Sequence, residues 1–146
     1  MSLFRIFDIA GSAMSAQSVR LNTTASNLAN AESVSSSAET TYRARRPIFA
    51  AALADALQGE GQGGGGEQAA MGVEVKGIVE SQAPLQREYN PAHPMADKDG
   101  FIYRSNVSQV EEMADMMSAS RSYQTNVQVA DSAKQMLLQT LRLGKG

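Results

Sequence analysis

The chain of 146 residues contains no cysteine, no tryptophan and a single histidine. Without cysteine, disulfide frameworks, thiolate nucleophiles and cysteine-ligated zinc are excluded. The one histidine, His93, precedes Pro94 in a turn-rich stretch, which favours a structural role over general acid–base catalysis. Glu111 and Asp115 would share one face of a helix, yet a pair of carboxylates alone does not make a catalytic site. We therefore expect neither an enzyme nor a protein with a metal or cofactor.

Long apolar runs and an excess of charge of one sign are also missing. No run of about 18 apolar residues occurs, so we expect no membrane span. The net charge of −2 argues against a nucleic acid partner, because phosphate binding needs a concentrated positive face. We interpret the basic cluster of Arg43, Arg45 and Arg46 as a charged strand edge. Residues 1–16 are amphipathic and include Asp8, unlike the apolar block of a signal peptide, so we expect no cleaved signal.

What the chain does have is heptad spacing at both ends, which predicts two long helices. We expect one helix over residues 2–31 and another over residues 106–143, with Gly144 as its stop. At about 1.5 Å per residue these helices would be roughly 45 and 57 Å long, and the second exceeds the width of so small a domain. The chain thus divides into an N-terminal axial helix (1–31), a middle region (32–105) and a C-terminal axial helix (106–146).

Each helix carries one narrow apolar stripe. The N-terminal stripe comprises Leu3, Phe7, Ala10, Met14, Gln17, Leu21, Thr24 and Leu28. The C-terminal stripe comprises Met113, Met116, Ser120, Tyr123, Val127, Ala130, Lys134, Leu137 and Leu141. Such stripes must be buried against other helices, and their polar members can select one register. Because both stripes lie at chain ends, they predict assembly rather than catalysis.

The middle region is expected to be rich in β-structure. Residues 72–82 alternate like a half-exposed strand, and residues 85–89 are expected to return beside them as a hairpin. Residues 42–49 predict a further short strand. Residues 59–66 hold six glycines and predict a loop. The expected fold class is therefore mainly α, with two long terminal helices forming a coiled-coil-like axial core and a small middle region based on a β-hairpin.

Two segments resemble the flagellar axial proteins. The first is Ser26-Asn27-Leu28-Ala29-Asn30 near the end of the N-terminal helix, a pattern shared by rod, hook and hook-associated proteins. The second covers residues 90–138, and its prolines, Asp97, Gly100 and helical residues resemble the signature of proximal-rod subunits. The resemblance includes both ends of the chain. It departs from the usual family pattern at Asn90, Met95 and the glycine-rich insert.

The resemblance implies a structural subunit of the bacterial flagellar rod, in the periplasmic part of the basal body, exported through the flagellar type III apparatus without a cleaved signal. The implied partners are copies of itself, other rod proteins, and motor membrane-ring and export-gate proteins, and its role is to transmit torque to the distal rod and hook. The stripes and motifs together predict the following assembly residues: Leu3, Phe7, Met14, Leu21, Asn27, Leu28, Asn30, Met113, Met116, Tyr123, Asn126, Val127, Leu137 and Leu141. A soluble helical adaptor or export chaperone remains an alternative, as does a cell-wall hydrolase.

Overall fold

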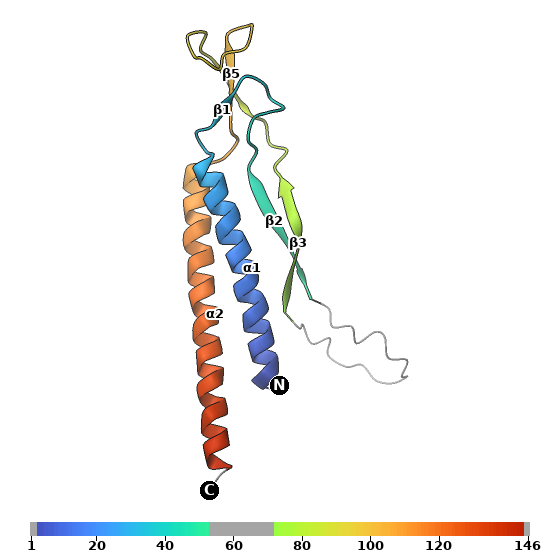
Figure 1. Cartoon of the computed structure of the whole chain (residues 1–146), viewed down its shortest axis with the longest axis vertical. Helices are drawn as coiled ribbons and strands as arrows, with labels where there is room; N and C mark the ends of the chain where they lie inside the picture. The colour runs from blue at the N-terminus through green and yellow to red at the C-terminus, as the bar shows by residue number, and fades with distance from the viewer. Residues whose placement is uncertain (1–2, 53–71, 145–146) are drawn as a thin grey trace, which may run out of the picture.

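The computed structural model describes residues 3–52 and 72–144, apart from the side chain of Leu3. Its elements in chain order are α1 (Leu3–Ala29), β1 (Val34–Ser35), β2 (Arg45–Ala51), β3 (Val73–Glu80), β4 (Gln86–Tyr89), β5 (Phe101–Arg104) and α2 (Gln109–Leu143). The two helices lie side by side in opposite directions, a two-stranded hairpin stands beside α1, and a small sheet covers the end where α1 finishes and α2 begins (Figure 1).

The helices confirm the prediction made from the two ends of the chain. α1 has 27 residues and α2 has 35, so they are about 40 and 52 Å long. Because α2 is longer, its C-terminal turns extend past the first residues of α1 (Figure 1). α2 begins after Ser108 rather than at Asn106, whose side chain is engaged elsewhere. The two terminal helices therefore pack against each other within a single chain.

The strands form two separate antiparallel sheets. One has the order β1-β5-β4, and the other is the hairpin of β2 with β3. In the hairpin Arg45 pairs with Glu80 and Ala51 with Val73, with a β-bulge between Ile48 and Phe49. The expected pairing of residues 72–82 with residues 85–89 is wrong, because β3 pairs with β2 and β4 pairs with β5.

The fold-class prediction of a mainly α protein is also wrong. Of the described residues, 50% are helical and about 20% are in strands, in two antiparallel sheets. Strands β1 and β5 were not predicted, because they have only two and four residues and are too short to show a periodic pattern. The short strand predicted over residues 42–49 corresponds to β2, which extends to Ala51. The predicted loop at residues 59–66 lies outside the described residues.

The interior of the described part is built mainly from small side chains. Six of its eight buried hydrophobic residues are alanines, and only Ile102 and Val107 are larger. One cluster joins Ala31, Ala44 and Val107 under the half-buried Tyr42, where the helices meet the sheets. Helices that approach through alanine can pack closely, but they bury little apolar area per residue. The subunit therefore has a thin core for its length.

Candidate assembly surface

The seam, which is the face of α2 that is buried within the chain, contains smaller residues than the predicted stripe. Glu112, Ala119 and Ala133 are buried, and Asn126, midway between the last two, is half-buried. These four positions repeat every seven residues. The predicted stripe instead chose Met113, Ser120, Val127 and Lys134, each the next residue along the chain. Of the alternate positions of the predicted stripe, Met116, Ala130 and Leu137 are half-buried, whereas Tyr123 is exposed.

The one-residue displacement of the predicted stripe from the observed seam has a simple cause. Alanine offers little apolar contrast, so a search for large apolar residues selected Met113 and Val127 beside the true seam. Met113 keeps 55% of its surface exposed, whereas Ala119 is 0% exposed. The exact heptad of Glu112, Ala119, Asn126 and Ala133 is the signal that could have identified the seam, if small residues had been accepted as buried.

Among the described residues, two ion pairs link α2 to other elements. Arg20 of α1 donates to the Asp115 carboxylate at 2.7 Å, and both side chains are roughly one-third exposed. Arg46 of β2 lies 3.5 Å from Glu111, with both side chains more than half exposed. The first turns of α2 thus contact α1 and the hairpin together. Because both candidate carboxylates are paired with arginine, they act as structural contacts.

Asn27, from the first family-like motif, is the largest fully buried side chain of the described part, with 1% exposed. Its Nδ2 donates to the Arg45 carbonyl at 2.8 Å, and its Oδ1 accepts the Arg45 N–H at 2.9 Å and the Tyr42 hydroxyl at 2.9 Å. Asn30 ends the helix locally, since its Nδ2 donates to the Ser26 carbonyl at 2.8 Å. Both motif asparagines therefore make contacts within the subunit.

Large apolar side chains gather on the outside instead. On α2, Val110, Met113 and Met117 are 78%, 55% and 64% exposed. Towards its end the exposed set comprises Val129, Met136, Leu138, Leu141 and Leu143. Leu137, Leu138 and Leu141 form an apolar surface on the last turns of α2. The hairpin exposes Ile48, Ile78 and Val79. Contiguous exposed apolar surface of this kind marks protein–protein contact.

The predicted assembly residues divide by exposure. Those that are half-buried comprise Phe7, Met14, Leu21, Leu28, Asn30, Met116, Asn126, Val127 and Leu137. Met113, Tyr123 and Leu141 are exposed, Asn27 is buried, and the side chain of Leu3 lies outside the described part. The exposed members are available to neighbours. For all fourteen, a role between subunits stays a prediction.

The remaining polar candidates make local contacts. His93 Nδ1 accepts the N–H of Met95 at 3.1 Å. Asp97 Oδ1 accepts the N–H groups of Asp99 and Phe101 at 2.9 and 2.8 Å, which makes an Asx-type turn. Across residues 3–52 and 72–144, no three metal-ligating side chains converge, and no helix is long and apolar enough to cross a bilayer.

In comparisons with known proteins, the two family models match the two ends of the chain, where the long helices lie. Residues 7–34 match the family model described as "Flagella basal body rod protein", and residues 98–143 match "Flagellar basal body rod FlgEFG protein C-terminal". The flagellar basal-body rod protein FlgC of Salmonella typhimurium is 48% identical over 145 residues, covering 99% of this chain and all of that protein. FlgC of Yersinia enterocolitica is 45% identical over 145 residues with the same coverage. FlgC of Borreliella burgdorferi is 34% identical over 161 residues, covering the whole of both chains.

The comparisons, together with the fold, define this chain as one of the class of flagellar basal-body rod proteins. The regions of the chain that match are the two helices and the segments beside them. Within that class the chain belongs to the FlgC family. Its relatives carry the name of a rod protein, which does not favour the adaptor or export-chaperone alternative.

Proposed function

We propose that this protein is a structural subunit of the proximal part of the bacterial flagellar rod, and that it catalyses no reaction. Membership of the FlgC family supports a place for the chain in the rod. In this proposal the subunit joins neighbours through the exposed apolar side chains of its terminal helices and passes torque from the motor ring towards the distal rod and hook.

One observation carries the proposal: many large apolar side chains are exposed, while most of the buried hydrophobic residues of the described part are alanines. A monomer that worked alone would lose little by exposing polar residues in place of Met113, Met117, Leu138 and Leu141. Fully burying one leucine stabilises a protein by roughly 1.5–3 kcal/mol. Since Leu141 still exposes 59% of its surface, a neighbour covering it would gain about 1 kcal/mol or more from that side chain alone.

The partners we propose are copies of this chain and other rod proteins, together with motor membrane-ring and export-gate proteins at the base. Its location would be the periplasmic rod, reached by type III export without a cleaved signal. Long helices with small cores support this picture, because subunits that form a tube can complete their packing in the assembly. The family name supports the basal body as the place where this happens.

The test is a charge placed on the exposed end of α2. Leu141→Asp should abolish rod formation and swimming in a strain that lacks the native gene, because an interface would have to bury an unpaired carboxylate. Gln139→Asp is the matched control, since residue 139 is an exposed polar position on the same turn and should tolerate the charge. Swimming by the Leu141→Asp strain at the control's rate would overturn the proposal.

A further inference from the structure

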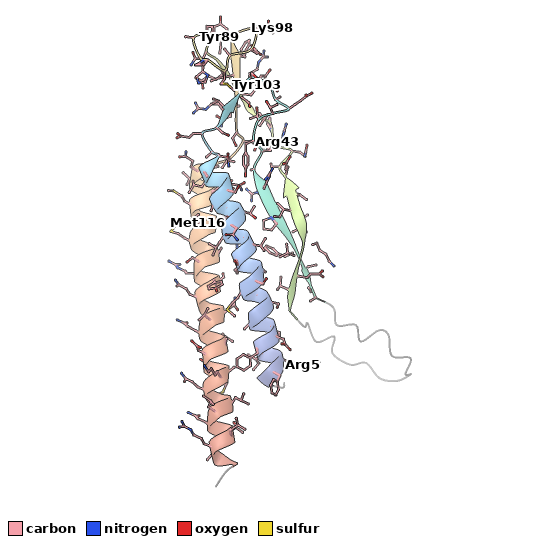
Figure 2. The ribbon with its side chains drawn as sticks, viewed as in Figure 1. Arg5, Arg43, Tyr89, Lys98, Tyr103 and Met116 are labelled. Carbon is pink, nitrogen blue, oxygen red and sulfur yellow. The ribbon has the colours of Figure 1, made fainter. Side chains whose placement is uncertain are left out.

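Two asparagines from opposite ends of the chain hold the same stretch of backbone. Asn27 is in the last turns of α1, and Asn106 stands just before α2. Asn27 binds both the N–H and the carbonyl of Arg45, while Asn106 Oδ1 accepts the neighbouring N–H of Ala44 at 2.8 Å. Residues 44–45 are where the chain enters β2. The end of α1 and the segment just before α2 therefore each contribute one amide to the base of the hairpin, beside Arg43 (Figure 2).

The exit of the hairpin is held at the same place. The N–H of Ser81, just after β3, donates to the Ala44 carbonyl at 2.7 Å. Asn106 Nδ2 donates to the Ala83 carbonyl at 3.0 Å, and Arg43 donates to the Ser81 and Ala83 carbonyls at 3.3 and 3.2 Å. Asn106 thus touches the chain on both sides of the hairpin.

The hydrogen-bonding capacity of these amides is well used. A side-chain amide offers two donors and an oxygen with two lone pairs. The oxygen of Asn27 accepts from Arg45 and Tyr42, and its NH₂ reaches the Arg45 carbonyl, so the side chain pairs with Arg45 as a neighbouring strand would. Asn27 is 1% exposed, so its bonds are shielded from water. Buried hydrogen bonds of this kind are directional and are costly to leave unmade.

Apolar packing at the base of the hairpin is too sparse to fix by itself the direction in which the hairpin points. The buried cluster there consists of Ala31, Ala44 and Val107, with Tyr42 beside it. Contacts between such small side chains are non-directional. The ion pair of Arg46 with Glu111 is more than half exposed and is therefore weak. The two amides make three hydrogen bonds to residues 44 and 45 at the hairpin base. At the other end of the hairpin, the N–H of Val73 donates to the Ser12 hydroxyl at 3.1 Å in an exposed hydrogen bond.

We infer that Asn27 and Asn106 form an asparagine clamp that fixes the angle at which the β2–β3 hairpin leaves the helix pair. Both residues therefore have positioning roles. The Asn27 amide binds Arg45 at the start of β2, and the Asn106 amide links Ala44, before β2, to Ala83, after β3. Identical subunits that stack in one way need the hairpin to point in one direction, and this consequence rests on the proposed rod function. The clamp itself is a property of the single chain.

The absence of cysteine allows a direct test in the full-length protein. Ala25→Cys on α1 and Lys76→Cys on β3, both exposed, would carry two spin labels for a pulsed-EPR distance measurement. In this background Asn27→Leu and Asn106→Leu each remove one amide while keeping the number and branching of the side-chain heavy atoms. Asn22→Leu, at an exposed position of α1, is the matched control.

We expect a narrow distance distribution in the labelled parent and the control, and a broadened or displaced one in each clamp variant. Circular dichroism would verify that helix content is retained. If Asn27→Leu loses its helical signal, Asn106→Leu decides, because residue 106 is only half-buried. A clamp variant that keeps both its helices and the parent distribution would overturn the inference, as would equal broadening in Asn22→Leu. The measurement needs no rod, so its result is independent of the Leu141→Asp test.

Discussion

Replacing Ala119 by leucine tests whether the helix pair is as closely packed as its buried alanines indicate. Ala119 lies in the middle of the seam with 0% of its surface exposed, so three additional carbon atoms have no free space. Adding methylenes to a well-packed interior costs typically about 1–3 kcal/mol through displaced backbone and strained rotamers. Taking about 2 kcal/mol, the ratio of folded to unfolded protein should fall by roughly 30-fold.

The same substitution five residues earlier supplies the control. Ala114 is exposed on α2, so Ala114→Leu makes the same chemical change without overpacking. Helix propensity changes by only a few tenths of a kcal/mol, about equally at both sites. The difference between the two variants therefore isolates the packing of the seam.

Urea unfolding followed by circular dichroism would measure the effect. With a slope near 2 kcal/mol per molar, a typical value for urea, the midpoint of Ala119→Leu should fall by about 1 M relative to Ala114→Leu. Equal midpoints would refute the reasoning, since they would mean that α1 and α2 are separated widely enough at residue 119 to accept a leucine.

Two other contacts lead to measurable expectations. A double-mutant cycle on Arg20→Ala and Asp115→Ala should give a coupling of about 1 kcal/mol or less that shrinks as salt is added, because the pair is partly exposed; a coupling insensitive to salt would contradict this. Gly72→Ala should lower stability by about 1–3 kcal/mol, because Gly72 has φ of 132° and a Cβ there would overlap the Ser12 hydroxyl. Gly77→Ala, with no atom within 4 Å of its Cβ, should cost little, and equal losses at the two glycines would speak against this explanation.

The thin interior connects stability with assembly. A chain whose buried apolar residues are mostly alanines gains little from its own core, so covering Met113, Met117 and Leu141 with neighbours would add a substantial share of its total stability. We therefore expect the subunit to become harder to unfold once it is incorporated. Gly72, Ala119 and the asparagine clamp would still decide how the single chain is shaped before that step.

Sequence reasoning was most successful where the signal was local. Heptad spacing located α1 and α2 to within a few residues, because helix formation depends on neighbours three and four positions apart. The two family-like segments led to the correct family. Strand pairing was the weakest point: β3 was expected to pair with residues 85–89, yet its partner β2 lies on the other side of a long connection. No local pattern encodes which strand will accept another strand's hydrogen bonds.

By itself, then, the sequence determined two long helices, a region of strands between them and membership of the rod family. Only the tertiary structure decided that the two helices pack against each other within one chain, that the α2 seam follows Ala119 and Ala133, and that Asn27 is buried against Arg45. The physical reason is that periodicity reports on contacts along a helix, whereas the burial of an alanine or the partner of an amide depends on residues distant in the chain. Those distant contacts exist only when the chain has folded.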